Sequence, residues 1–539
     1  MKLLSISCAA LLCITAAALA TEGTRTFTTV TPGGDVTETV TGSYTYAAVE
    51  DPAPLLSGEI WHYTLATGPQ QKVCPIGMGG DFVLTGGWYG GARMFDGVTG
   101  DGTVLWTYEP AGSWTSLGTG TVAAQTQDLC YAVQNWNPGK DLDLASNTAV
   151  HCFTSASSTP VWSYDGTGTF DSGSVDGPGK SACSADGSVL AVGGAIGGHL
   201  AVLFFESGSP VPTAVYENPA VAYYPRQLRI TADGTKCIFR CSAVLYRVDV
   251  ATGTLESTYS LGASTDCFGV SPDGSVVAYG FTAAHVIQWD GSQYNPAGGC
   301  SVPGHYGGAA AVAADNSTIY WGFYSSSYLS NRIIRYDLSV PEVVWQYDYP
   351  TGSGGYQDVV EWVDCSSDGR WSVVASWGCQ SGGGDEVCVF DDLAPGAPVF
   401  SINTPGSMFH ADITDDGKYI TAAGKHVHAN VMGSGTDVYM AEVTQTGIGG
   451  GGLAPACTLD LYPNPASGPI TARIGLPAPG TATLEVFDLS GRVVYSGEEP
   501  FQQAGQYLVQ LDRLPGAGVY FCRMTSGDFT ATRRFAVID

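Results

Sequence analysis

The sequence predicts an almost entirely β protein: a seven- or eight-bladed β-propeller, with eight blades favoured, followed by a small immunoglobulin-like β-sandwich. Three observations support this fold class: the chain has 72 glycines among 539 residues, a turn pattern returns along its middle, and its composition changes near Gly447. Glycine supplies the positive φ of tight turns, and the many β-branched and aromatic residues suit a pleated sheet. With 44% hydrophobic and 13% charged residues, the composition is that of a folded protein.

The repeated turn has a small polar residue, one further residue and then Asp-Gly, before an alternating apolar run. Its copies are Ser184–Gly187, Thr231–Gly234, Ser271–Gly274, Ser366–Gly369 and Thr414–Gly417, with Ala313–Asn316 as a variant and Asp81 and Asp128 at equivalent places. Successive Asp residues lie about 40 to 58 residues apart, near the period of a four-stranded propeller blade. Eight such positions predict eight blades, or seven if one early match is spurious. Asp-Gly predicts a type I′ turn, in which both central residues have positive φ.

A second repeat consists of an apolar residue followed by Trp-x-Tyr, which we interpret as the outer strand of a blade. It occurs at Leu105–Tyr108, Val161–Tyr164 and Val344–Tyr347, and once before all the Asp turns, at Ile60–Tyr63. The last Asp turn is followed by two predicted strands and no outer strand. We therefore expect the N-terminal strand to close the ring by completing the last blade, which removes exposed sheet edges.

Residues 57–445 resemble the broad propeller superfamilies, both WD-repeat-like and quinoprotein-like. The resemblance concerns architecture and implies little about activity. Only Trp289-Asp290 stands where a WD repeat has its dipeptide, and the chain lacks the adjacent cysteine pair that marks quinoprotein dehydrogenases.

The two ends of the chain predict export. Residues 1–20 have a positive start, an apolar stretch and a small-x-small motif, so we expect a signal peptide cleaved between Ala20 and Thr21. An N-terminal segment, 21–56, precedes the propeller. A glycine-rich linker, 446–456, separates the propeller from the last domain, 457–539.

Three motifs mark that last domain, and together they resemble the C-terminal sorting domain of type IX secretion cargo. The matching residues are Tyr462, Pro463, Asn464 and Pro465 in the opening strand, Gly491 and Arg492 in the central turn, and Gly518, Val519 and Tyr520 in a late strand. The resemblance implies passage through the periplasm, recognition by outer-membrane secretion machinery, and a secreted or cell-surface location. Whether the protein is released or anchored stays open.

The net charge and the motifs limit the functions that the propeller can have. A net charge of −28 disfavours nucleic acid as a partner, and no later apolar run is long enough for a transmembrane segment. We find no catalytic motif and assign no catalytic, cofactor-binding or metal residues. Gly179-Lys180-Ser181 is interpreted as a turn rather than a phosphate-binding loop. His426 and His428, on one face of a predicted strand, are a weak metal-binding pair beside the ordinary interpretation as core or surface histidines.

Calcium is the one candidate cofactor, because several acidic loops could bind it through carboxylate oxygens. The ordinary interpretation of these loops is that they are solvated turns. The residues concerned are Asp141, Asp143, Asp385, Glu386, Asp391 and Asp392. Aromatic residues form either a glycan- or peptide-binding rim or, as the favoured interpretation, the core between blades. These are Tyr347, Tyr349, Tyr356, Trp371 and Trp377.

Thirteen cysteines remain after the predicted signal peptide is removed. In an oxidising compartment outside the cytoplasm, we expect some of them to form disulfides. Two pairs, Cys130 with Cys152 and Cys379 with Cys388, flank predicted hairpins and are candidate disulfides. Cys237 and Cys241 lie too far apart on one predicted strand to pair with each other.

Three functions remain open for the propeller. The favoured one is a non-catalytic extracellular module that binds a protein, peptide or glycan. The alternatives are a secreted enzyme, hydrolase or quinoprotein-like, with a funnel site that leaves no local motif, and a structural surface-layer component.

Overall fold

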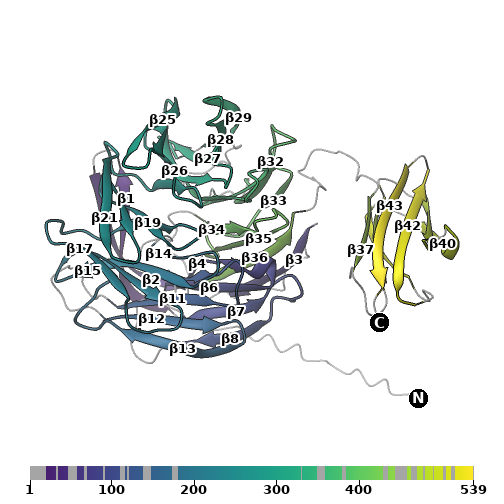
Figure 1. The fold of residues 1–539 in the computed structure, drawn as a ribbon, viewed down its shortest axis with the longest axis horizontal. Coiled ribbons are helices and arrows are strands. Elements are labelled where there is room, and N and C mark those ends of the chain that lie inside the picture. Colours follow the sequence, from purple (N-terminus) through teal and green to yellow (C-terminus); the bar gives the residue numbers. More distant parts are fainter. Residues whose placement is uncertain are drawn as a thin grey trace, which may run out of the picture. The chain divides into compact units, whose positions relative to one another are not determined.

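The computed structural model describes residues 20–31, 34–45, 58–65, 70–88, 91–109, 116–117, 120–136, 147–172, 180–328, 330–348, 358–378, 384–428, 435–443, 458–462, 470–476, 480–489, 491–501, 505–511, 516–527 and 529–537. The chain divides into two compact units, Met1–Thr444 and Gln445–Asp539, called here the body and the C-terminal unit (Figure 1). Both consist of β-strands, with a single 3₁₀ turn (Met78–Gly80) among the described residues, which confirms the predicted all-β class. The finer domain boundaries stay a prediction.

Six sheets of the body have four antiparallel strands each. Five of them use consecutive strands. Their strands are β14 (Ser181–Cys183), β15 (Val189–Ile196), β16 (His199–Glu206) and β17 (Ala214–Asn218); β18 (Arg226–Ile230), β19 (Lys236–Cys241), β20 (Val244–Asp249) and β21 (Thr254–Ser260); β22 (Cys267–Val270), β23 (Val276–Gly280), β24 (Ala283–Trp289) and β25 (Tyr294–Ser301); β26 (His305–Val312), β27 (Thr318–Ser325), β28 (Asn331–Asp337) and β29 (Glu342–Asp348); β30 (Val360–Cys365), β31 (Trp371–Ser376), β32 (Val387–Asp391) and β33 (Phe400–Ile402).

The sixth sheet confirms the predicted closure of the ring. It contains β34 (Met408–Ile413), β35 (Tyr419–Gly424) and β36 (Thr436–Glu442), and its outer strand is β3 (Glu59–Leu65) from the start of the chain. Trp61 lies opposite Met440 in this antiparallel pairing. The last sheet therefore cannot be completed without β3.

The remaining body strands form a ten-stranded sheet. They are β4 (Gln70–Val73), β5 (Ile76–Gly77), β6 (Phe82–Trp88), β7 (Ala92–Asp96), β8 (Val104–Tyr108), β9 (Ser116–Leu117), β10 (Val122–Ala123), β11 (Cys130–Trp136), β12 (Asn147–Thr154) and β13 (Ser157–Asp165). The short β9 pairs with both β6 and β11 and so joins two groups of strands. Divided at β9, this sheet and the six others make eight groups in a propeller-like body; the choice between seven and eight blades stays a prediction. A separate hairpin pairs β1 (Ala20–Thr31) with β2 (Gly34–Thr45), so Ala20 and Thr21 of the predicted cleavage site begin β1.

The Asp-Gly turns connect the first and second strands of their sheets, but the predicted type I′ geometry is wrong. In the first copy only Gly187 has a positive φ, 69°, and Asp186 does not. Five residues separate β14 from β15, so the loop is an ordinary turn ending in a left-handed residue, closed by the Gly187 N–H donating to the Ser184 carbonyl (2.9 Å). The Asp186 carboxylate accepts hydrogen bonds from the Ser184 hydroxyl and the Ser188 N–H, at 2.7 and 2.9 Å. The small polar residue and the Asp thus stabilise the loop together.

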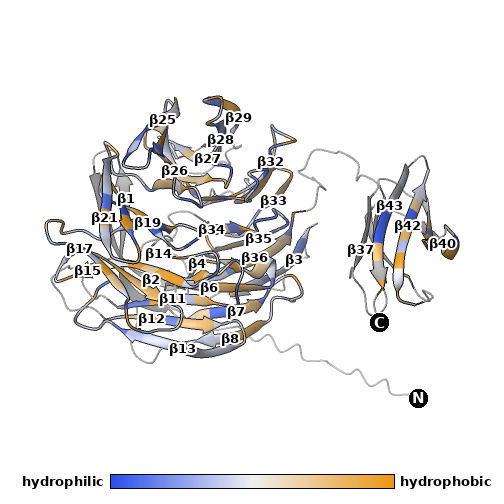
Figure 2. Cartoon of the chain, viewed as in Figure 1, coloured by the Kyte–Doolittle hydropathy of each residue, from blue (hydrophilic) through white to orange (hydrophobic). Residues whose placement is uncertain are grey.

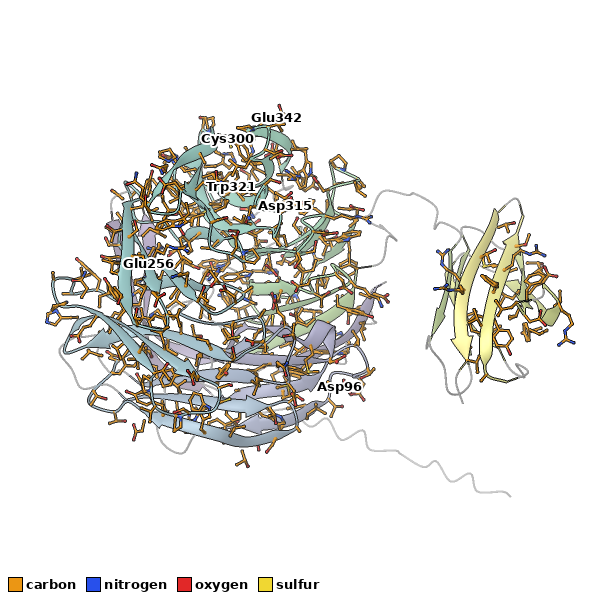
Figure 3. The ribbon with its side chains drawn as sticks, viewed as in Figure 1. Asp96, Glu256, Cys300, Asp315, Trp321 and Glu342 are labelled. Atoms are coloured by element: carbon orange, nitrogen blue, oxygen red, sulfur yellow. The ribbon has the colours of Figure 1, made fainter. Side chains whose placement is uncertain are left out.

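The Trp-x-Tyr strands are outer strands, as predicted, and the tryptophan of each contacts the next group of strands. Trp61, Trp106, Trp162 and Trp345 lie 5.2 to 5.6 Å, centroid to centroid, from one phenylalanine each: Phe95, Phe153, Phe205 and Phe390. The four indole N–H groups donate at 2.6 to 2.8 Å to Gly97, Ser155, Ser207 and Asp392, which follow the strands carrying those rings. One short motif therefore supplies both stacking and a hydrogen bond between neighbouring sheets. Figure 3 places Trp321 inside the body and Glu342 toward its edge.

The predicted Cys130–Cys152 disulfide is wrong. Both thiols are free, because Cys130 lies opposite Phe153 and Cys152 opposite Tyr131. A register offset of one residue places the two side chains on opposite faces of the sheet, and they join different core clusters. Cys237 and Cys241 do not pair with each other, as expected, and both are free; Cys379 lies outside the described residues.

The C-terminal unit contains a three-stranded and a four-stranded antiparallel sheet. The first has β37 (Thr458–Tyr462), β38 (Ile470–Leu476) and β41 (Gly505–Leu511); the second has β39 (Gly480–Phe487), β40 (Val493–Phe501), β42 (Gly518–Ser526) and β43 (Phe529–Val537). Ile470 and Leu511 from the first share one core with Leu484, Tyr520 and Phe535 from the second. This packing of two sheets agrees with the predicted sandwich.

Candidate functional site

In each sheet with an Asp turn, the strand before that turn is the inner strand, and most successive inner strands contact one another. β14 contacts β18, β22 contacts β26, β26 contacts β30, and β30 contacts β34, which in turn contacts β4. The inner strands thus face a common central region of the body, which we call the channel (Figure 1).

One end of this channel is bordered by the Asp-Gly turns, which bond to each other through the backbone. The N–H of Ala185 donates to the Ala232 carbonyl (3.0 Å), and that of Ala232 to Pro272 (2.7 Å). Farther round, Ala314 donates to Ser367 (3.0 Å) and Ser367 to Asp415 (3.1 Å). We call this end the turn face and the opposite end, where the inner strands begin, the loop face.

Several inner strands carry a β-bulge. The pairing register shifts between Arg226 and Arg229 in β18, between Val360 and Trp362 in β30, and between Met408 and His410 in β34. Gln227, inside the first bulge, has a φ of 51°, which is costly for a residue other than glycine. Bulges redirect side chains, and the residue that ends each of these three bulges belongs to the cluster described next.

A group of polar side chains meets in the channel: Arg229 from β18, Trp362 and Asp364 from β30, and His410 and Asp412 from β34. We call these five residues the channel cluster. The guanidinium carbon of Arg229 lies 4.9 Å from the ring centroid of Trp362, and the Trp362 and His410 centroids are 4.6 Å apart. Neighbouring residues on the same strands, such as Leu228, Val363 and Ala411, are buried in core clusters instead.

The two carboxyl groups of the cluster form a pair. Asp364 and Asp412 hydrogen-bond each other, and each also accepts a backbone N–H: Ile413 donates to Asp364 Oδ2 and Ile76 to Asp412 Oδ2, both at 3.0 Å. Burial, above all, raises the pKa of both groups, and for Asp412 the neighbouring Asp364 charge adds to it. Two carboxylates in contact repel, so the pair favours holding one proton between them.

Arg229 is charged at neutral pH, whereas His410 is neutral. Burial lowers the pKa of Arg229 to about 10, against the attraction of Asp364 and Asp412, so the guanidinium is charged at neutral pH. Burial, aided by Arg229, lowers the pKa of His410 to about 3, so this imidazole is neutral. The nearby Cys74 thiol lies 3.6 Å from His410 Nδ1, but burial raises its pKa well above the ordinary value. Cys74 therefore stays protonated, which disfavours it as a nucleophile.

Arg229 has few partners of its own. Its guanidinium donates to the Leu228 carbonyl at 3.0 Å, and no ion pair within 4.0 Å involves it among the residues that the structure describes. Other enclosed arginines are paired; Arg335, for example, lies 3.0 Å from the Asp392 carboxylate. Arg229 thus presents a charged fork of donors to the channel.

A cavity of about 220 Å³ opens at the turn face beside the carboxyl pair. It is lined by Ile76, Gly79, Gln125, Asp412, Ile413, Thr414, Asp415 and Asp416. Asp412 therefore belongs both to the channel cluster and to this cavity.

Among the described metal and rim candidates, His428 contacts Glu386, whereas His426 contacts Asp437 instead. His426 and His428 follow β35 rather than lying on a strand; His426 Nδ1 is 2.8 Å from Asp437 and His428 Nε2 is 3.0 Å from Glu386. In the described part of the chain, no group of three or more His, Cys, Asp or Glu residues is arranged to hold a metal ion.

The described acidic candidates bind donors of the protein. Asp385 accepts from Ser401, Asp391 binds Arg370, and Asp392 binds Arg335. Asp141 and Asp143 lie outside the described residues, and calcium stays a prediction.

Of the three described aromatic candidates, Trp371 belongs to the core and Tyr347 packs against it, as favoured, whereas Trp377 is partly exposed. Trp371 is buried in a core cluster, and Tyr347 packs 5.5 Å from Phe390. Trp377 donates its indole N–H to Glu361 at 3.0 Å. Tyr349 and Tyr356 lie outside the described residues, and Lys180-Ser181 leads directly into β14, as expected for a turn.

The sorting motifs can be followed for part of their length. Tyr462 ends β37, and Pro463, Asn464 and Pro465 lie outside the described residues. Gly491 has a φ of 80° in a turn where the Arg492 N–H donates to the Asp488 carboxylate at 3.0 Å.

The late-strand residues lie in β42. Gly518 and Val519 precede Tyr520, whose buried ring stacks 5.5 Å from Phe535. Arg533 and Arg534 are exposed on β43, which carries a hydrophilic stretch in Figure 2.

Comparison with known protein families decides the nature of this unit. Residues 460–538 match the secretion system C-terminal sorting domain. The tail is a type IX sorting domain. The protein is therefore exported cargo, secreted or attached to the cell surface. None of the curated proteins compared matches the chain. Within the described residues, no helix has the length and apolar character needed to span a membrane.

The channel cluster was missed at the sequence level, although the repeat contains a signal for it. Arg229, Asp364 and Asp412 each stand two residues before the Ser or Thr that opens an Asp turn. At the same position the other repeats carry Ala182, Gly269 and Ala311. Charged residues that replace Ala or Gly at one level of the repeat point to a site inside the channel.

Proposed function

We propose that the exported body is a non-catalytic extracellular binding module, and that its channel cluster takes a small ligand carrying an anionic group such as a carboxylate or phosphate. The observation that carries this proposal is Arg229, a charged guanidinium enclosed in the channel without an ion pair among the described residues. An enclosed charge of this kind costs stability. Asp364 and Asp412 attract Arg229 without forming an ion pair with it, and a ligand anion would supply the direct pair.

The surrounding groups fit such a ligand. The guanidinium fork matches two oxygens of a carboxylate or phosphate. The Asp364–Asp412 pair offers both a proton and an acceptor, which suits a hydroxyl or amine elsewhere in the same ligand. Trp362 and the neutral His410 supply flat walls on one side of Arg229.

Replacing the charge by an apolar side chain of similar length tests the proposal. We expect Arg229→Met to leave the free energy of unfolding of the full chain unchanged or to raise it by about 1 to 4 kcal/mol. Small anions, with acetate, succinate and inorganic phosphate as probes, should raise the melting temperature of the unaltered protein and not that of Arg229→Met.

Arg335→Met is the matched control, because Arg335 has an ion pair with Asp392 and donates to the Thr318 hydroxyl. Its loss should cost about 3 to 5 kcal/mol. If Arg229→Met costs as much and no probe stabilises the unaltered protein, Arg229 has a structural role and the proposal is wrong.

The carboxyl pair supports a second candidate, an acid–base hydrolase. Two carboxyl groups that share a proton are the arrangement by which a pair of aspartates activates water. Hydrolysis of casein or soluble polysaccharides between pH 4 and 8, abolished by Asp364→Asn and by Asp412→Asn, would establish it. Hydrolysis that survives both substitutions would reject the pair as its origin.

A further inference from the structure

The loop face carries a second group of aromatic residues, separate from the channel cluster. Phe281 lies between β23 and β24, Tyr306 in β26, Tyr324 in β27, and Tyr328 between β27 and β28. Successive ring centroids are 5.8, 5.9 and 5.5 Å apart, and the last two rings are stacked at 14°. All four side chains are partly exposed. We call them the loop-face aromatics.

Their hydroxyl groups distinguish these tyrosines from those of the core. Tyr294 and Tyr320 donate to the carbonyls of Gly274 and Gly369, both at 2.7 Å. The hydroxyls of Tyr306, Tyr324 and Tyr328 have no hydrogen bond to any described residue. Three unused donors therefore surround one aromatic surface.

The backbone at one of these residues, Tyr328, is strained. Tyr328 has a φ of 58°, which a bulky residue rarely adopts. Its N–H donates to the Ser325 carbonyl and its own carbonyl accepts from the Asp358 N–H, both at 2.8 Å. Strain of this kind persists where the surroundings enforce it, and it gathers at ligand sites.

Two acidic side chains act on the rings through their charge: Asp266, which is paired with Arg240, and Glu361, which accepts a hydrogen bond from Trp377. The charges of Asp266 and Glu361 are among the causes that raise the pKa of Tyr324, after burial. Burial also raises the pKa of Tyr328, so the phenols are un-ionised donors at neutral pH. Flat aromatic faces, phenol donors and carboxylate acceptors together suit the apolar faces and hydroxyl groups of a sugar.

We infer that the loop-face aromatics form a binding site for a neutral glycan. Neutrality follows from charge: a chain with a net charge of −28 and carboxylates beside the rings repels polyanions. The site is independent of the ligand proposed for the channel cluster, since it shares no residue with it.

Calorimetric titration of the mature chain tests this inference, with maltohexaose and cellohexaose as neutral probes and hexagalacturonate as the anionic comparator. We expect at least one neutral probe to bind and the anionic one not to bind. Tyr306→Ala and Tyr328→Ala should each weaken binding about fivefold to tenfold. Tyr328→Phe keeps the ring and should weaken binding less.

Tyr223→Ala is the matched control, because this tyrosine is 64% exposed near the start of β18 and outside the group. It should bind as the unaltered protein does. The inference is overturned if neither neutral probe binds, if hexagalacturonate binds as well as they do, or if Tyr306→Ala and Tyr328→Ala both bind normally. Unchanged melting temperatures show that the variants are folded.

Discussion

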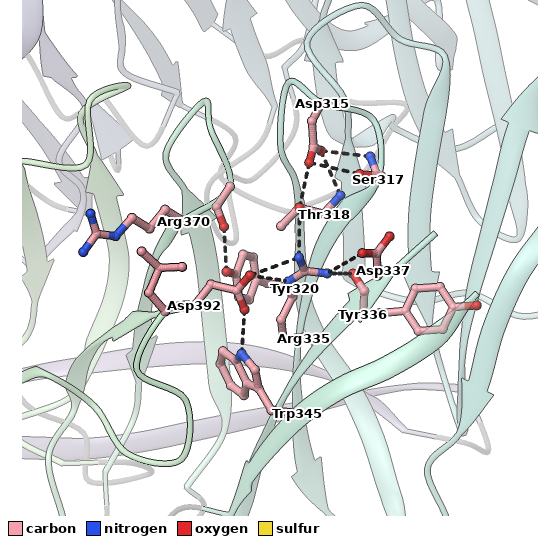
Figure 4. A network of polar contacts seen from close by, with 12 residues as sticks. Asp315, Ser317, Thr318, Tyr320, Arg335, Tyr336, Asp337, Trp345, Arg370 and Asp392 are labelled. Carbon is pink, nitrogen blue, oxygen red and sulfur yellow. Dashed lines mark hydrogen bonds and ion pairs between the residues drawn. The ribbon is translucent and has the colours of Figure 1, made fainter. Parts of the chain in front are cut away.

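The indole Nε1 of Trp345 donates a hydrogen bond of 2.8 Å to Oδ1 of Asp392, which joins the outer strand of one sheet to the end of β32 in the next. Arg335 binds Oδ2 of the same carboxylate and donates to the Thr318 hydroxyl at 3.2 Å, so Asp392 is held from two sides (Figure 4). The same tryptophan contact, to a backbone carbonyl, recurs at three other junctions. These contacts link neighbouring sheets of the body to each other.

Trp345→Phe should destabilise the full chain by about 1 to 2 kcal/mol, because the ring can still stack on Phe390 while the indole donor is lost. Urea unfolding measures the change. Val344→Ala, at a neighbouring side chain that is 48% exposed, should stay within about 0.5 kcal/mol. Equal effects of the two substitutions would show that the indole hydrogen bond contributes nothing.

Gly417→Ala should be among the most destabilising changes in a turn. Gly417 has a φ of 68°, and an added Cβ would lie 2.0 Å from Cδ1 of the buried Trp371. We expect about 1 kcal/mol from the backbone and about 1 to 3 kcal/mol more from the overlap. Gly197→Ala, with a φ of 55° and no atom within 4 Å of the added Cβ, should show the first cost alone. A loss at Gly417 no larger than that at Gly197 would contradict the packing of this turn.

The carboxyl pair predicts a stability that falls as pH rises. Because the folded pKa values of Asp364 and Asp412 are raised, the folded state holds a proton that the unfolded chain releases near pH 4. Stability that is present below pH 4 is therefore lost as pH rises through the raised values, by at most about 1.4 kcal/mol per pH unit. Arg229, with a pKa of about 10, and His410, with one of about 3, do not titrate between pH 5 and 8.

Asp412→Asn should remove this loss, so its stability relative to the unaltered protein should increase from pH 5 to pH 8 in urea titrations. Asp290→Asn is the control. Backbone hydrogen bonds from Gln293 and Ser292 lower the pKa of Asp290 to about 2, so its contribution changes only below about pH 4. Parallel pH curves for Asp412→Asn and the unaltered protein would show that the pair shares no proton.

Deleting residues 457–539 should leave the body in the periplasm, since the sorting domain is what directs export. Cell fractionation measures the distribution. The reciprocal experiment attaches the same residues to an inert periplasmic reporter, which should then reach the outside. Normal export of the truncated chain would refute the role of the tail.

The thiols predict the redox state of the folded body. Cys130 and Cys152 lie on opposite faces of one sheet, so denaturing alkylation without reductant should label both. Mass spectrometry of the corresponding peptides, with and without reductant, checks this. A Cys130–Cys152 disulfide in the purified protein would contradict the strand register.

Local pattern predicted much of this fold. Asp-Gly turns marked the first hairpin of the sheets, and Trp-x-Tyr marked outer strands because period-2 alternation places both rings on one face. The unpaired motif at Ile60–Tyr63 predicted that β3 would complete the last sheet. The turn type was predicted wrongly, since the dipeptide alone does not reveal that five residues separate β14 from β15.

The candidate site was less predictable. Arg229 and Trp362 are 133 positions apart, as their numbers show, and they meet only because the inner strands close around a channel. The disulfide prediction failed for a related reason: pairing depends on a register that cysteine spacing does not contain.

By itself the sequence determined that the chain is all-β, that the strand at Ile60–Tyr63 completes the last sheet of the body, and that the final residues are an export signal, because each depends on short patterns read within one strand, turn or domain. Only the tertiary structure decided which charged groups share the channel and which tyrosines gather at the loop face. Such contacts are made across sheets, and their energies depend on burial and on partners that no local stretch of sequence specifies.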